Sequence, residues 1–277
     1  MLNKAYPMSK IEKGYAEVNS AKLYYEVAGQ GKPVVLIHGF TLDTRMWDDQ
    51  FLEFSKIYRV LRYDIRGYGK SSIPTNRDYT DANDLMSLMK MNKIEKAYIA
   101  GLSMGGSIAI DFTLSNPEAV MKLVLVDSTL GGYTWTKRYG DASNLIWAAC
   151  KEQGLEVAKA MWLDSEIFCK EDENPMVYQR LKKIIDDYSG VQFFGDVPGF
   201  MAKIKDPPPA KRLGDIHVPT LVIVGERDSL DFHIIADLIV DNAPNARKYV
   251  IPNVKHMSNM EDPETFNREV LSFLSSS

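Results

Sequence analysis

Hydrophobic and polar residues follow two alternating spacings along this chain. Continuous apolar runs, typical of strands buried on both faces, occupy residues 33–39, 58–64, 96–101, 121–127 and 219–225, with a weaker one at 246–252. Near the start, two further runs at 14–19 and 22–29 predict a hairpin that turns at Asn19 and Ser20. The pattern therefore predicts about eight strands.

Helical spacing separates these runs. One helix is predicted around Leu85, Leu88 and Met89, and another over 104–115, ending before Pro117. Strands that alternate with helices along a chain form a mostly parallel sheet with helices on both faces. We therefore predict an α/β fold of that kind.

The alternation stops between residues 131 and 209, where the spacing is helical throughout. The clearest helix face there consists of Val177, Leu181, Ile184, Ile185 and Tyr188. Three prolines at 207–209 prevent a helix from continuing, and the strand pattern resumes at 219. We therefore predict a helical cap at 131–209, inserted into a core formed by 1–130 and 210–277.

Composition excludes several classes of protein. The 277 residues are 45% hydrophobic and 25% charged, as in ordinary globular proteins, and the net charge of −4 predicts neither a nucleic-acid nor a membrane partner. No run is long enough for a signal peptide or a membrane span. Cys150 and Cys169 lack metal-ligand spacing. We expect a cytoplasmic protein with no metal or cofactor; the sequence leaves its oligomeric state open.

The stretch GLSMGG, residues 101–106, lies where a buried strand is followed by a helix. Gly-x-Ser-x-Gly in that setting is the pattern of a nucleophile elbow, a turn so sharp that side chains beside the serine would collide. The turn places a serine hydroxyl at the start of a helix, where backbone N–H groups favour developing negative charge. Ser103 is therefore the candidate nucleophile, and the alternative is a plain glycine-rich turn.

A serine nucleophile needs a base, and the base needs an orienting acid. Of the four histidines, His256 lies in a polar loop between the last strand and the last helix, and it is the favoured base. His217 and His233 are expected to be structural. For the acid we favour Asp228, after the strand at 219–225, over the competing Asp127, and we expect Asp231 to cap the following helix.

Two backbone N–H groups are needed to stabilise the oxyanion of an acyl-transfer reaction. Met104 follows the proposed nucleophile directly, so its amide is the first candidate. The loop after the strand at 33–39 would supply the second, which we assign to Phe40. His38, in the same HGF motif, suits this loop better than the role of a base.

These motifs resemble those of the α/β-hydrolase fold superfamily over nearly the whole chain. HGF, DIRGYGKS (64–71), GLSMGG, GERD and KHMSNMEDPETF occur in that family's order and spacing. Ser103, Asp228 and His256 occur along the chain in the order serine, acid, histidine, which is the order of the catalytic triad in that family. DIRGYGKS is expected to form a structural turn, and Trp47 to pack in the core.

GLSMGG and HMSN are similar to the same segments of oxoadipate enol-lactone hydrolases and related small esterases. The resemblance implies a cofactor-free serine hydrolase that cleaves a small carboxylic ester or lactone through an acyl-enzyme. Leu102 and Met257 stand where C–C bond hydrolases of ring-cleavage products usually have Asn and Trp. That activity, cofactor-free perhydrolysis, and a ligand-sensing role for the same triad remain open alternatives.

Aromatic and apolar residues of the predicted cap suggest an apolar substrate pocket. Trp135 and Trp162 are the candidate substrate contacts, and further candidates for the lining are Trp147, Met161, Phe193 and Phe194. Packing within the cap is the alternative for each of them.

Overall fold

Within the described part of the chain, eight strands form one sheet in the order β1-β2-β4-β3-β5-β6-β7-β8, and the pairs β1–β2 and β2–β4 are antiparallel. The structure is a computed structural model, and it describes residues 10–75, 79–194 and 206–276. The strands are Glu12–Val18, Ala21–Ala28, Pro33–Ile37, Arg59–Tyr63, Ala97–Leu102, Val120–Val126, Thr220–Gly225 and Ala246–Ile251, numbered β1 to β8. The predicted mostly parallel sheet is confirmed.

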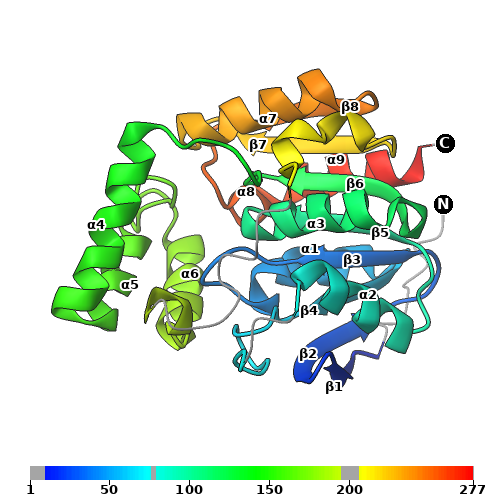
Figure 1. The fold of residues 1–277 in the computed structure, drawn as a ribbon, viewed down its shortest axis with the longest axis horizontal. Coiled ribbons are helices and arrows are strands. Elements are labelled where there is room, and N and C mark those ends of the chain that lie inside the picture. The colour runs from blue at the N-terminus through cyan, green and yellow to red at the C-terminus, as the bar shows by residue number, and fades with distance from the viewer. Residues whose placement is uncertain (1–9, 76–78, 195–205, 277) are drawn as a thin grey trace, which may run out of the picture.

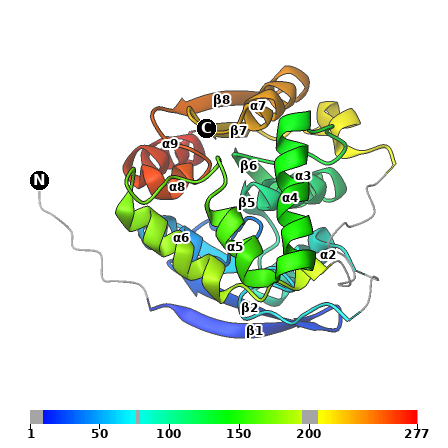
Figure 2. The ribbon, with the colours of Figure 1, turned by 90° about the vertical axis from the view of Figure 1, so that its left-hand side faces the viewer.

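Helices cover both faces of this sheet (Figures 1 and 2). On one face α1 packs against α9, and on the other α2 packs against α3. The helices outside the predicted cap are α1 (Asp48–Phe54), α2 (Asp81–Met91), α3 (Met104–Ser115), α7 (Leu230–Asn242), α8 (Ser258–Glu261) and α9 (Pro263–Ser275). Every residue of β5 and of β7 is buried, as the continuous apolar runs predicted.

The first two strands form the predicted hairpin. Both turn residues have positive φ, 45° at Asn19 and 64° at Ser20, which is the conformation of a two-residue turn that matches strand twist. The hairpin extends the sheet on the side of β4. It lies far from β5, β6 and β7, whose carboxyl ends meet at one edge because these strands are parallel neighbours.

The α-helices described within the predicted cap, between residues 131 and 194, are α4 (Lys137–Gln153), α5 (Leu155–Leu163) and α6 (Pro175–Asp187). Figure 1 shows them beyond one end of the sheet. All five positions of the predicted apolar face around α6 are buried: Val177, Leu181, Ile184, Ile185 and Tyr188.

The two ends of this segment lie side by side, since the Ala210 N–H donates to the Gly131 carbonyl over 2.9 Å. Residues 195–205 of the predicted cap lie outside the described residues. The role of the segment as a cap remains a prediction.

Among the described residues, no helix combines the length and the apolar character that crossing a membrane requires. Cys150 and Cys169 are both buried, and neither forms a disulfide. Burial raises the pKa of both thiols, so both stay protonated at neutral pH.

Candidate active site

Ser103 lies in the turn between β5 and α3, with φ 54° and ψ −116°. Positive φ is rare for residues other than glycine, and it marks the sharp reversal that GLSMGG predicts. The Ser103 N–H donates to the Val126 carbonyl of β6 over 2.9 Å, and the Ser103 carbonyl accepts from the Thr129 N–H over 3.1 Å. The turn is therefore fixed to the neighbouring strand.

The glycines around Ser103 are required by close backbone approach. A Cβ atom at Gly101 would overlap the carbonyl of Gly105, and one at Gly105 would overlap the carbonyl of Ile37. Glycine at 101 therefore lets the end of β5 approach the start of α3, and glycine at 105 lets α3 approach the end of β3.

His256 and Asp228 meet at the same edge of the sheet. The distance from His256 Nδ1 to Asp228 Oδ2 is 2.8 Å, and both side chains are almost fully buried. Asp228 Oδ1 also accepts the Ser229 N–H over 2.7 Å. The carboxylate therefore holds the proton on Nδ1, which leaves Nε2 of the neutral imidazole as an acceptor.

Burial lowers the pKa of His256, because an imidazolium is poorly solvated there. The imidazole is consequently neutral at neutral pH, as a general base must be. Among the described residues, no hydrogen bond joins Ser103 Oγ to His256. In free enzymes this contact is often long and shortens when the substrate binds.

Asp127, the competing candidate for the acid, also lies beside this pair. Its Oδ1 accepts the Gly225 N–H over 2.8 Å, and its Oδ2 lies 2.7 Å from Ser258 Oγ. His256 Nδ1 is directed to Asp228 and not to Asp127. The geometry favours Asp228 as the acid.

The loop after β3 is held by a buried histidine. His38 Nε2 accepts the Ile65 N–H over 2.9 Å, so Nδ1 carries the proton and donates to the Gly39 carbonyl over 2.8 Å. Burial lowers the pKa of His38, which keeps it neutral. His38 therefore braces the loop that contains Phe40.

The other candidate amide of the oxyanion hole belongs to Met104, the first residue of α3. The first N–H groups of a helix have no acceptor within the helix, so the Met104 amide can serve an external oxygen. Gly39 lies directly beside Ser103, since a Cβ atom built at Gly39 would lie 3.4 Å from Ser103 Cβ. The loop and the elbow are thus in contact.

The segment 131–194 reaches both parts of the site. Trp162 Nε1 donates to Thr41 Oγ1 over 2.8 Å. The rings of Trp162 and of Phe40, the residue before Thr41, lie edge to face with centroids 5.5 Å apart. The His256 N–H donates to the Ile167 carbonyl over 3.1 Å. Neither contact was predicted from the sequence, because each joins residues more than 80 positions apart with no local pattern to mark it.

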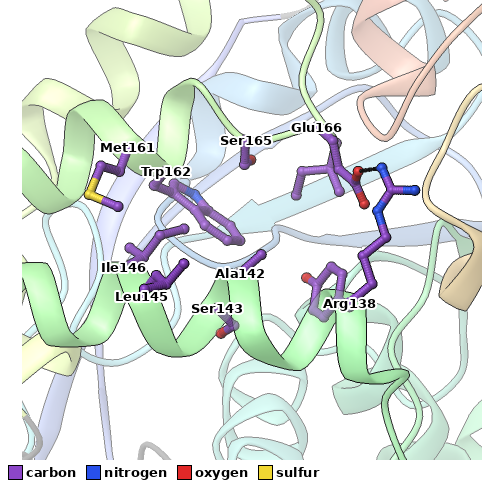
Figure 3. Close-up of a pocket in the computed structure, with 11 residues that line it drawn as sticks. Arg138, Ala142, Ser143, Leu145, Ile146, Met161, Trp162, Ser165 and Glu166 are labelled. Atoms are coloured by element: carbon purple, nitrogen blue, oxygen red, sulfur yellow. Dashed lines mark hydrogen bonds and ion pairs between the residues drawn. The ribbon is translucent and has the colours of Figure 1, made fainter.

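A pocket of about 280 Å³ lies between α4 and the segment that contains α5 and the turn after it (Figure 3). Its apolar walls come from both sides, with Ile146 on α4 facing Trp162 on α5. At one side Arg138 and Glu166 form an ion pair. The lining comprises Arg138, Tyr139, Ala142, Ser143, Leu145, Ile146, Met161, Trp162, Ser165, Glu166 and Ile167.

Trp162 and Met161, two of the candidate contacts, line this pocket. Trp135 does not line the pocket. Its ring stacks on Tyr139 with centroids 4.4 Å apart and lies edge to face with Phe232. The ring of Phe232 in turn lies against His256, with centroids 4.3 Å apart. Trp147 and Phe193 pack against Phe40 instead. The side chain of Phe194 lies outside the described residues.

Several structural expectations are confirmed around the site. Asp64, in DIRGYGKS, accepts the backbone N–H groups of Thr44 and Lys70, each over 2.8 Å, and so fixes a turn. Trp47 is fully buried against Phe266. His217 is exposed and His233 lies on α7, and the structural role expected for both stays a prediction.

The expectation for Asp231 was wrong. Ser229, not Asp231, is the N-cap residue of α7, and Asp231 is buried in contact with the segment at 133–136. It accepts hydrogen bonds from the Tyr133 hydroxyl, the Thr136 N–H and the Thr136 hydroxyl. These partners, almost 100 residues away, satisfy the carboxylate more fully than one cap would.

Potential metal ligands among the described residues gather at Asp127, Asp228 and His256, whose ligand atoms lie within 4.8 Å of one another. The ligand atoms of these three residues already take part in hydrogen bonds, either with each other or with the Gly225 N–H and the Ser258 hydroxyl. The arrangement therefore fits a hydrogen-bonded network better than a metal site.

Comparison with known proteins decides the family. Residues 32–156 match the family model described as alpha/beta hydrolase fold. Over 269 residues the chain is 31% identical to a 2-hydroxy-6-oxononadienedioate/2-hydroxy-6-oxononatrienedioate hydrolase from Burkholderia vietnamiensis, and the alignment covers 91% of each protein. The chain belongs to the α/β-hydrolase superfamily.

Solved structures also resemble this α/β hydrolase. An esterase from Exiguobacterium antarcticum is 25% identical with a TM-score of 0.80, over 95% of this chain and 99% of the other. Est816, described as an N-acyl homoserine lactone degrading enzyme, is 26% identical with a TM-score of 0.78, over 94% of this chain and 100% of the other. The relatives thus act on several kinds of bond.

Proposed function

We propose that this α/β hydrolase is a serine hydrolase that cleaves a carboxylic ester or lactone through an acyl-enzyme. The observation that carries the proposal is the Asp228–His256 pair, joined over 2.8 Å, at the sheet edge where the elbow presents Ser103. A nucleophile beside a base that is oriented by an acid is the arrangement that activates a serine hydroxyl.

In the proposed mechanism, Ser103 Oγ attacks the substrate carbonyl while His256 Nε2 takes the hydroxyl proton. Asp228 keeps the imidazole in the correct tautomer and stabilises the imidazolium that forms. His256 then returns the proton to the leaving alkoxide. In the second half, His256 activates water, which hydrolyses the ester bond to Ser103 and frees the acid.

The amides of Phe40 and Met104 would bind the oxyanion of both tetrahedral intermediates. His38 supports the first of them through its hydrogen bond to the Gly39 carbonyl, and Trp162 supports the same loop through Thr41. Preorganised donors of this kind are often the largest single contribution to acyl transfer.

We further propose that residues 131–209 act as a cap that selects the substrate. Support comes from the contacts of Trp162 with Thr41 and of Ile167 with His256, which tie this segment to the site. Trp162 and Ile167 also line the pocket between α4 and α5. Its mainly apolar lining fits the acyl chain or aromatic group of a small or medium substrate.

The second candidate is hydrolysis of a C–C bond in a ring-cleavage product, because the 31% identical relative carries a name of that kind. Leu102 and Met257 depart from the residues usual in such enzymes, which favours the ester or lactone. Perhydrolysis has no comparable support.

The deciding experiment measures turnover on a matched panel of nitrophenyl esters, lactones and ring-cleavage dienones. We expect steady-state turnover on an ester or lactone, with kcat within the usual enzyme range of about 1–10³ s⁻¹, and much slower turnover on dienones. The reverse order would assign the C–C reaction. A single turnover followed by binding of a partner protein would indicate a ligand sensor instead.

A further inference from the structure

Asp127 is a second buried carboxyl beside the proposed acid. It follows β6, as Asp228 follows β7, and these two strands are neighbours in the sheet. Asp127 is 1% exposed, and ligand atoms of Asp127, Asp228 and His256 lie within 4.8 Å of one another. The mechanism uses only one of the two carboxyls, so the second requires an explanation.

The environment of Asp127 is unusual for a carboxylate. No lysine or arginine of the described residues forms an ion pair with it, and its partners are the Gly225 N–H and the Ser258 hydroxyl. Its backbone also has φ 43°, in the left-handed region. Such backbone strain is maintained where the surroundings require a particular side-chain position.

Two carboxylates within 4.8 Å of each other in a buried site repel strongly, which favours a state in which one of them is protonated. Burial raises the pKa of both, and the negative charge of Asp228 raises the pKa of Asp127 further. Asp228 accepts the imidazole N–H of His256 over 2.8 Å and the Ser229 N–H over 2.7 Å, so it is the carboxyl whose charge would stabilise an imidazolium. The shared proton therefore resides on Asp127.

We propose that Asp127 is a neutral carboxylic acid that donates a hydrogen bond to the Asp228 carboxylate, and is thus a positioning residue for the acid of the triad. The inference rests on the proposed function. During acylation the proton of Ser103 moves to His256, Asp228 stays ionised against the imidazolium, and the proton of Asp127 remains on Asp127.

Two substitutions separate the parts of this role. Asn and Gly both tolerate the positive φ at this position, so neither is strained by the backbone. Asp127→Asn keeps a neutral hydrogen-bond donor, and we expect kcat within a few-fold of wild type. Asp127→Gly removes the donor, and we expect kcat to fall on the order of tenfold to a hundredfold with little change in KM, the range for a lost hydrogen bond to a charged group.

The pH profile of kcat/KM tests the charge of Asp127. The acid limb of this profile reports protonation of His256. The charged groups near His256 are Asp228, Asp127 and Glu261, and the charge of Glu166, in the turn after α5, raises the pKa of Asp228. A neutral Asp127 can be replaced by Asn without moving that limb. An ionised Asp127 could not, because losing a negative charge beside His256 would move the midpoint down by about one pH unit or more.

The matched control is Asp231→Asn, another buried carboxyl at this end of the sheet. It should leave the acid limb unchanged. The inference is overturned if Asp127→Asn moves the acid limb to lower pH, or if Asp127→Gly turns over as wild type does.

Infrared spectroscopy of the free protein supplies a readout that needs no substrate. The C=O stretch of a protonated carboxyl should be present near neutral pH in the wild type and should lose intensity in Asp127→Asn. Other buried carboxyls, such as Asp81, can add to the band, so the difference between variants is the measurement. No loss in Asp127→Asn overturns the inference, whereas a wild type inactive on every ester and lactone overturns the proposed function.

Discussion

Two ion pairs beside the sheet are buried, whereas two ion pairs on the inserted helices are exposed. In the core, Arg66 and Asp84 form an ion pair whose side chains are 2% and 3% exposed. Arg62 on β4 and Glu26 on β2 form a second buried ion pair. In the insertion, the Lys137–Asp141 and Lys183–Asp187 pairs on α4 and α6 lie in solvent. Buried pairs are costly to break, and exposed pairs contribute little.

Apolar residues differ between the two regions in the same way. The strands that carry the site are buried throughout, whereas Leu145 on α4 is 63% exposed although it lines the pocket. This difference agrees with the proposal that the sheet edge fixes the catalytic groups and that the insertion selects the substrate. Changes in the sheet should affect catalysis or folding, and changes in the insertion should affect substrate choice.

The largest effect should come from the nucleophile. Ser103→Ala removes the atom that forms the acyl-enzyme, so kcat should fall by several orders of magnitude while the protein stays folded. A fluorophosphonate probe should label Ser103 in the wild type and nothing in the variant. Near-normal hydrolysis by the variant, with unchanged circular dichroism, would contradict the assignment.

The next effect should come from the acid. Asp228→Asn leaves the shape of the site intact but allows the wrong tautomer of His256, and we expect kcat to fall by roughly 10⁴-fold. Asp127→Asn, measured beside it, should cost far less. If the two variants ranked in the opposite order, the acid would belong to β6.

A feature of the fold or of the site could be predicted where the residues that cause it lie close together in the sequence. GLSMGG identifies the turn at Ser103 because the motif is contiguous in the sequence and lies between a strand pattern and a helix pattern. The apolar runs identify strands because burial on both faces excludes polar residues. The partners of Asp231 and the contact of Trp162 with Thr41 could not be predicted, since each depends on how segments about 100 residues apart fold together. The insertion was predicted as helical, but the location of its pocket was not.

Breaking a buried pair should destabilise the fold more than breaking an exposed one. Asp84→Ala leaves the Arg66 guanidinium buried without its counter-ion, and we expect a loss of about 3–5 kcal/mol in the free energy of unfolding. Asp141→Ala, the matched variant on α4, should change it by less than about 1 kcal/mol. Urea denaturation of both variants makes the comparison, and equal losses would show that the two regions do not differ in this respect.

The smallest effect should appear in substrate choice, as a function of acyl chain length. Each added methylene that the pocket buries contributes about 0.8 kcal/mol, so kcat/KM on nitrophenyl esters should rise about fourfold per carbon until the pocket is full and then fall. Ala142→Phe would fill part of the pocket and should move the optimum to shorter chains, with little change on acetate. Asn144→Phe is the matched control, since Asn144 lies on the same helix, is exposed and does not line the pocket. A profile that is flat, or that both variants change equally, would mean that the pocket between α4 and α5 does not hold the acyl chain.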